Sequence, residues 1–131
     1  MRCISVRQPW AALIIHAGKN IENRSRATHV RGRVLIHASL FNDHNYTEAA
    51  MSFARGISNQ IPVGLFLQHG GIIGSVEIVD CVTESKSPWF DGSGFGWVLA
   101  NPIRLPFIPC KGSLGFFNAP DDVMEKIGKV G

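Results

Sequence analysis

The residues best placed to do chemistry follow the first apolar segment of the chain. Lys19, Glu22 and Arg24 come directly after "WAALIIHAG". A carboxylate three residues from an ammonium group keeps that group charged and oriented, so the pair could anchor a phosphate or a base carbonyl. The alternative is a surface ion pair worth ~0–1 kcal/mol. We favour a cleft, with Lys19 and Glu22 in one solvent-reachable pocket walled by the first helix and the later strands.

Arginine is concentrated near the same stretch. Residues 1–60 hold eight Lys and Arg against three acids, whereas residues 61–131 hold five against seven. Arg24 and Arg26 are two apart and share one face of an extended segment. With Arg31 and Arg33, we expect them to form one basic surface beside the cleft, because guanidinium groups bind phosphate bidentately. The alternative is a solvated hairpin on a protein whose net charge is only +3.

Two further polar side chains are candidates. His37 lies on a strand-like segment and could act as a general acid or base with Lys19 or Glu22, although a single strand histidine is usually structural. Ser113, in "KGSLG", could donate to a ligand or cap a turn. The sequence contains no serine triad, P-loop or metal-ligand cluster. The catalytic residues are therefore unknown, with Lys19, Glu22 and His37 as candidates.

The tryptophans divide by context. Trp89 and Phe90 lie in "SPWFDGSG", a loop pattern, so they could stack on a nucleic-acid base or cap the end of a barrel. Trp10, in the first turn of a helix pattern, fits the core better than a stacking platform. Trp97, in "GWVL", is predicted to be core.

The elements that must position these residues are mostly strands. Alternating or apolar runs predict strands over 3–6, 33–39, 71–82, 95–105 and 112–117. Helical spacing and caps predict helices over 9–17, 43–55 and 121–129. Gly74 predicts a bend or bulge inside its strand. The pattern indicates an α+β fold, a small mixed β-barrel of about five or six strands with two or three packed helices.

Composition narrows the class of protein. A chain of 131 residues suits one domain, 1–131. No apolar run reaches the ~18 residues of a membrane span, and no signal peptide is visible. Cys3, Cys81 and Cys110 are odd in number and dispersed, which favours buried thiols in a reducing compartment over disulfides or zinc. We expect a cytoplasmic protein, a monomer, without metal, cofactor or membrane partner.

Several segments together resemble a known family. "QPWA" (8–11), "GKNIENR" (18–24) and "RGRVLIHAS" (31–39) occur in the order found in the ASCH domain family, whose members share a PUA-like barrel. "GGIIGSVEIVDCV" (70–82), "SPWF" to "IRL" (87–105) and "PCKGSLGFF" (109–117) resemble its later strands. The segment 42–69 is the least constrained.

The resemblance implies a role with nucleic acid. PUA-like barrels mostly bind RNA, often structured or modified, and ASCH members are thought to use the cleft beside the first helix, where Lys19 matches the pocket lysine. Some small relatives hydrolyse N4-acetylcytidine, and one branch is credited with ribonuclease activity. That amidohydrolase branch carries a threonine nucleophile where this chain has Glu22, and a carboxylate cannot replace an activated hydroxyl in that mechanism. We therefore expect an RNA- or other nucleic-acid-binding module, with a small hydrolase or ribonuclease as the alternative.

Overall fold

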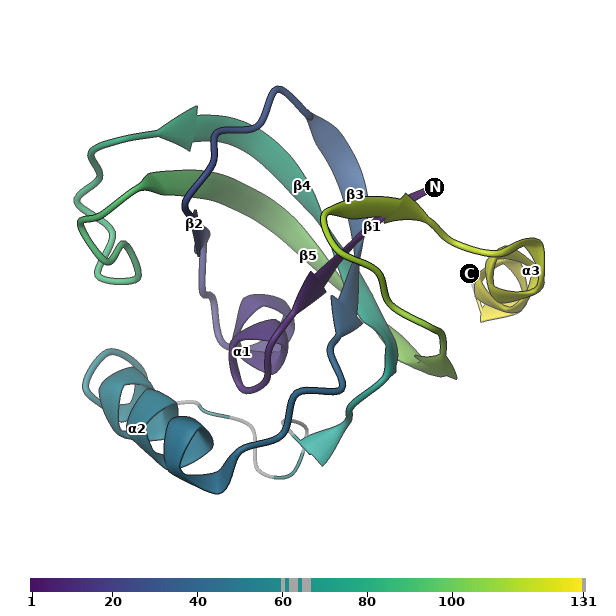
Figure 1. Cartoon of the computed structure of the whole chain (residues 1–131), viewed down its shortest axis with the longest axis horizontal. Helices are drawn as coiled ribbons and strands as arrows, with labels where there is room; N and C mark the ends of the chain where they lie inside the picture. The colour runs from purple at the N-terminus through teal and green to yellow at the C-terminus, as the bar shows by residue number, and fades with distance from the viewer. Residues whose placement is uncertain (60, 62–63, 65–66, 131) are drawn as a thin grey trace.

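A six-stranded mixed sheet curls around one short helix (Figure 1). The computed structural model describes residues 1–59, 61, 64 and 67–130. Its elements are β1 (Arg2–Val6), α1 (Trp10–His16), β2 (Ile21–Arg24), β3 (Gly32–Ala38), α2 (His44–Arg55), β4 (Gly71–Val82), β5 (Phe95–Pro109), β6 (Phe116–Asn118) and α3 (Asp121–Val130). The strand order is β2-β5-β4-β3-β1-β6.

The pairing of β1 with β3 makes the sheet mixed. These strands are parallel, with Ser5 opposite His37, and every other pairing in the sheet is antiparallel. Because parallel neighbours need a crossover, the chain between them has room for α1 and β2. The return places β2 at the far edge of the sheet, next to β5.

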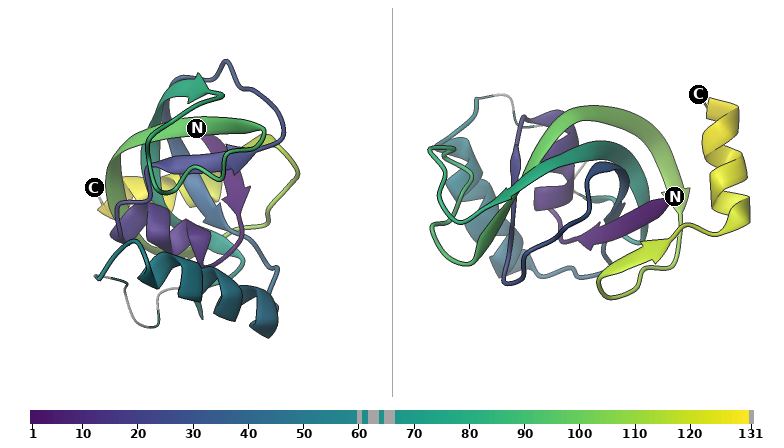
Figure 2. Two further views of the ribbon diagram at one scale, coloured as in Figure 1. Left: turned by 90° about the vertical axis from the view of Figure 1, so that its left-hand side faces the viewer. Right: turned by 90° about the horizontal axis from the view of Figure 1, so that it is seen from above.

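Each face of the sheet is covered by a different helix. The concave face buries Ile4, Val6, Ile36 and Ala38 against Ile14 and its neighbours on α1. The convex face buries a smaller set against α3: Cys3, Leu35, Ile72, Ile108 and Val123. Successive side chains of β1 and β3 point to opposite faces of the sheet, so each strand contributes to both hydrophobic cores. The helix α2 lies at the opposite end of the molecule from α3 (Figure 2).

Two contacts join strands from opposite sides of the sheet. The Trp97 ring on β5 stacks on the Phe116 ring on β6, with centroids 5.4 Å apart and planes 7° apart. Arg24, at the end of β2, donates from Nη2 to the main-chain oxygen of Ser5 on β1 at 2.8 Å. These contacts draw the sheet into a half-barrel, because each joins a strand near one edge to a strand near the other.

Gly74 lies where β4 bends and where other elements approach it closely. The pairing register shifts between Ile72 and Gly74. A Cβ atom at Gly74 would lie 2.6 Å from the main-chain oxygen of Ile103 and 2.7 Å from Cδ1 of Ile15. The missing side chain lets α1 and β5 approach β4 together.

The predicted α+β fold is confirmed, and so are its three helices and the bend at Gly74. The strand predicted over 112–117 was wrong in its bounds, because residues 112–115 form a turn before β6. The short β2 was not predicted at all, since "IENR" lacks strand alternation and becomes a strand through pairing with β5.

The thiols behave as predicted for two of the three cysteines. Cys3 and Cys110 are buried beneath α3, whereas Cys81 is half-buried. Burial raises the pKa of Cys3 to about 11. None of the helices in the described part of the chain is long and apolar enough to cross a membrane.

Replacing Gly74 with Ala should lower the free energy of unfolding by ~1–3 kcal/mol, because the new methyl group overlaps a main-chain oxygen. Urea unfolding measures this change. Gly128→Ala on α3 is the control, since a Cβ there meets nothing within 4 Å. That control should stabilise by up to ~1 kcal/mol, as alanine favours helix. Equal stability of wild type and Gly74→Ala would contradict the close approach.

Candidate nucleotide-binding pocket

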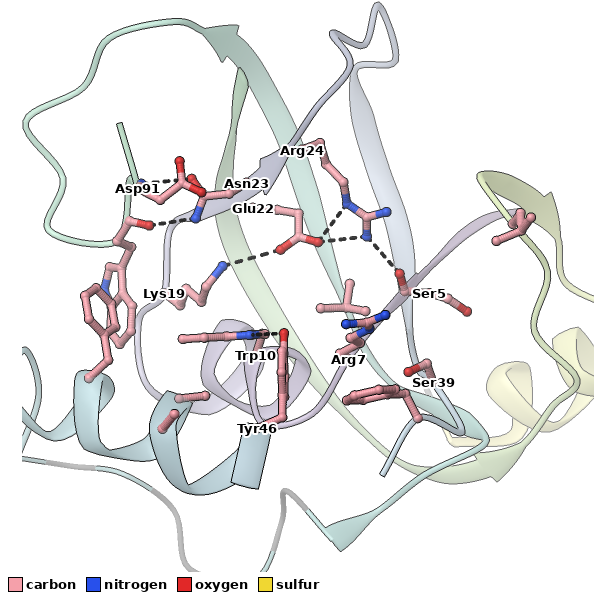
Figure 3. Close-up of a pocket in the computed structure, with 17 residues that line it drawn as sticks. Ser5, Arg7, Trp10, Lys19, Glu22, Asn23, Arg24, Ser39, Tyr46 and Asp91 are labelled. Atoms are coloured by element: carbon pink, nitrogen blue, oxygen red, sulfur yellow. Dashed lines mark hydrogen bonds and ion pairs between the residues drawn. The ribbon is translucent and has the colours of Figure 1, made fainter. Parts of the chain in front are cut away.

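A pocket of about 930 Å³ lies between the open end of the half-barrel and α2 (Figure 3). Its floor comes from the end of α1 and from β2, and its walls come from α2, the loop after β4 and the segments after β1 and β3. The lining residues are Ser5, Val6, Arg7, Trp10, Lys19, Glu22, Asn23, Arg24, Ser39, Phe41, Tyr46, Ala49, Ala50, Phe53, Trp89, Asp91 and Leu114.

The end of α1 delivers Lys19 to the floor. Gly18 has φ +75°, a left-handed conformation that ends the helix and reverses the chain. The amide groups of Ala17 and Lys19 both donate to the Leu13 oxygen, at 3.0 and 3.1 Å. Lys19 is thereby folded back under the helix end, where the residue is 4% exposed.

Glu22 holds two cations at the floor of the pocket. Its Oε1 lies 3.4 Å from Nζ of Lys19. Its Oε2 accepts from Nε of Arg24 at 2.9 Å and lies 2.7 Å from Nη2 of the same guanidinium. Lys19 also donates to the main-chain oxygen of Ile21. Figure 3 shows the three side chains in a row across the pocket. The group carries a net charge of +1.

Burial shifts the protonation of Lys19. Loss of water around the ammonium group lowers the pKa of Lys19 below its ordinary value. The Glu22 carboxylate opposes that shift through its charge and hydrogen bond, and the Arg24 guanidinium adds to it. Because buried charges are costly unless paired, this arrangement holds only while Glu22 stays between its two partners.

The walls are aromatic. Nε1 of Trp10 donates to the Tyr46 hydroxyl oxygen at 2.9 Å, joining α1 to α2 across the pocket. The Phe53 ring meets the Trp10 and Trp89 rings edge to face, with centroids 6.2 and 6.5 Å apart. Lys19 Nζ lies 5.6 Å from the centre of the Trp10 ring. Flat apolar surfaces therefore stand directly above the charged floor.

Arg7 lies at the mouth of the pocket. Its guanidinium carbon is 4.0 Å from the Phe41 ring centre and 5.5 Å from that of Tyr46. Arg7 is exposed, and no acid within the described residues forms an ion pair with it. Ser39, nearby in the lining, has a buried Oγ that lacks a hydrogen-bond partner among the described residues.

Asn23 fixes the far wall. Its Nδ2 donates to the main-chain oxygen of Trp89 at 3.0 Å, and its Oδ1 accepts from the amide of Asp91 at 3.1 Å. Both ends of the Asn23 amide are thus used to pin the loop after β4 against β2. This holds Trp89 in place as a wall.

Comparison with known proteins gives the family. The ASCH domain matches residues 4–109, which is most of the chain. The chain belongs to the ASCH domain family. These are PUA-like domains that generally bind RNA.

Two relatives align with this ASCH chain over 88 residues. Activating signal cointegrator 1 from Homo sapiens is 31% identical, and the protein of the same name from Mus musculus is 30% identical. The match covers 64% of this chain but only 15% of each relative.

The four predicted arginines make separate contacts in the ASCH fold. Arg24 lies in the pocket, bound to Glu22. Arg31 lines a separate hollow, where its Nη1 donates to the main-chain oxygens of Thr28 and Val30. Arg33 bonds Glu77 and Ser75 on β4. Arg26 is exposed and lines neither hollow. These separate contacts give no support to the expected single basic surface, which stays a prediction.

Three other predicted site residues lie apart from the floor. His37 is 1% exposed, and its Nε2 and Nδ1 lie 2.6 Å from the Cys110 oxygen and from Ser5 Oγ. A carbonyl only accepts, so Nε2 carries a hydrogen and donates to the Cys110 oxygen. Ser113 is exposed and outside the lining. Trp89 is 5% exposed, so it packs in a small core and shows the pocket only part of its surface.

The predicted walls also need correction. Lys19 is only 4% exposed, so it is more enclosed than predicted. The wall opposite the first helix comes from α2 and not from the later strands. Sequence reasoning missed Arg7, Tyr46 and Phe53 as lining residues. The available signal was the Ala/Met/Phe face of the 43–55 helix, which indicates packing but not its partner. The described residues contain no group of His, Cys, Asp and Glu that could hold a metal ion.

Replacing Lys19 with Met should remove a pH dependence of stability. Because the pKa of Lys19 is lowered on folding, the unfolded chain binds the extra proton between the lowered and the ordinary pKa, and wild-type stability rises with pH there. Lys19→Met lacks that rise. The unfolding free energy of wild type minus that of the variant should therefore increase as the pH approaches the ordinary lysine pKa of about 10.4 from below.

Urea unfolding across this pH range gives both stabilities. Lys111→Met is the matched control, because Lys111 is exposed and its difference from wild type should stay flat. A Lys19→Met difference that is constant or shrinks with pH would contradict the buried ammonium.

Proposed function

We propose that this ASCH domain binds RNA by taking one nucleotide into the pocket. The base lies between the aromatic walls with its polar edge on the floor, and its phosphate lies at Arg7. The observation that carries the proposal is the buried Lys19–Glu22–Arg24 group directly beneath Trp10 and Tyr46. Single-stranded RNA is read by this combination of stacking surfaces and polar groups that contact base edges.

The floor and walls offer hydrogen-bond donors. Lys19 has two acceptors among the described residues, which leaves its third hydrogen for a ligand. Nη1 of Arg24 has no acceptor within that same part of the chain. The Tyr46 oxygen accepts from Trp10, so its own hydrogen can point to a ligand. This set suits the carbonyl-rich edge of a base.

Size and charge agree with that ligand. The volume of about 930 Å³ lies near the upper end of the range of about 300–1,000 Å³ for small-molecule sites. An unmodified pyrimidine base would fill only part of this volume, so the pocket also has room for a modified nucleotide. The floor and Arg7 together are cationic, which favours a phosphate over a neutral nucleoside.

A hydrolase is the less favoured alternative. The amidohydrolase branch requires a hydroxyl at the position of Glu22, and here the carboxylate is committed to two cations. The Ser5 hydroxyl is paired with the buried His37, and Gly112 packs against both. Formation of product from N4-acetylcytidine or from labelled RNA by the wild-type protein would reverse this preference.

Arg7→Ala should weaken binding to a fluorescently labelled single-stranded RNA and make it less dependent on salt. Losing one phosphate contact should reduce the slope of log affinity against log salt by ~0.7. Fluorescence anisotropy at several salt concentrations measures the slope. Arg55→Ala is the control, because Arg55 is exposed on α2 and does not line the pocket.

The two variants must differ for the proposal to stand. Equal slopes for Arg7→Ala and Arg55→Ala would remove Arg7 from the site. Absence of RNA binding by the wild type would overturn the proposed function itself.

A further inference from the structure

We infer that the RNA ligand is a base-paired stem from which one nucleotide swings out into the pocket, and that Leu114 fills the gap it leaves. The inference rests on the proposed function and specifies its substrate class. Two observations support it: the floor residues are deeply buried, and one leucine at the mouth is almost fully exposed.

The depth of the floor requires an unstacked base. Lys19 and Glu22 are 4% and 8% exposed, so a base edge that contacts them has passed between Trp10 and the far wall. A base within a helix cannot do so while stacked on its neighbours. A stem could supply it only by rotating the nucleotide out of the duplex.

Leu114 is the apolar residue at the mouth that folding does not explain. It is 98% exposed, the most exposed of the large hydrophobic side chains described, and it lines the pocket. A leucine that protrudes beside a base-sized pocket has the shape and chemistry of the wedges that proteins insert between base steps. Insertion would bury this side chain and offset part of the cost of unstacking.

The turn that carries Leu114 is anchored at its base. The Cys110 oxygen accepts from His37, and the Cys110 amide donates to the Gly70 oxygen at 3.1 Å. Gly112 lies so close to the His37 ring and Ser5 Oγ that a Cβ there would be 2.6 and 2.8 Å from them. The hydrogen-bonded Ser5–His37 pair therefore packs against this turn and holds in place the segment from which Leu114 projects.

The same turn carries a cation. Lys111 is exposed and has no ion-pair partner among the described residues. With Arg7 at the mouth, this gives a bound stem a second cation for its phosphates.

The test uses a short RNA stem in which a mismatched uridine, the base to be extruded, lies next to 2-aminopurine, whose emission rises when the neighbouring base leaves the stack. Wild-type protein should raise that emission on binding. Leu114→Ser should bind the stem about tenfold more weakly and without the rise, because the gap is left unfilled. Leu114→Ser should lose less affinity for an unpaired RNA of the same sequence than for the stem, because only the stem leaves a gap to be filled.

Leu40→Ser is the matched control, because Leu40 is 78% exposed and lies outside the lining. It should behave as wild type on both RNAs. Stem binding by the wild type without a rise in emission, or an unchanged Leu114→Ser, would overturn the inference while leaving the proposed function in place. Failure of wild type to bind even the unpaired RNA would overturn both.

Discussion

The Glu22 carboxylate, held between Lys19 and Arg24, is the interaction on which the rest of the structure depends. It keeps the ammonium group at the end of α1 charged despite its burial, and it orients the guanidinium on β2. That guanidinium in turn reaches the main chain of β1 through the Ser5 oxygen. The same ion group that forms the floor of the pocket therefore also helps close the half-barrel, so site and fold are not separable at this point.

Ser5 joins the two functional regions of the chain. Its main-chain oxygen accepts from Arg24 at the floor, and its hydroxyl pairs with His37 beneath the turn that carries Leu114. The β1–β3 pairing sets both contacts, because it places Ser5 opposite His37. A fixed distance between the floor and the mouth follows from strand geometry. The wall formed by α2 depends instead on side-chain contacts such as the Trp10–Tyr46 bond.

Local sequence signals predicted the position of Lys19 and Glu22 past the first helix and most of the fold. They missed features that depend on strand register and on where α2 packs. Gly18 ends α1, so the next charged side chains were expected past the helix end, and they are there. The single arginine surface stays a prediction. Arg24 ends β2, and Arg33 lies opposite Glu77, a register that no local pattern reveals. The amphipathic face of α2 predicted a helix. Which surface it covers depends on contacts between residues far apart in the sequence.

The burial of two thiols has a practical consequence for spectroscopy. Cys3 and Cys110 are enclosed beneath α3, and the pKa of each is raised by burial, so little thiolate forms near neutral pH. Cys81 is the most accessible thiol of the three, and it lines the separate hollow rather than the pocket that contains Lys19 and Glu22. A maleimide dye added to the native protein would therefore attach chiefly at Cys81. The unmutated chain thus carries its own attachment point for energy-transfer measurements, at a distance from the site where RNA would bind.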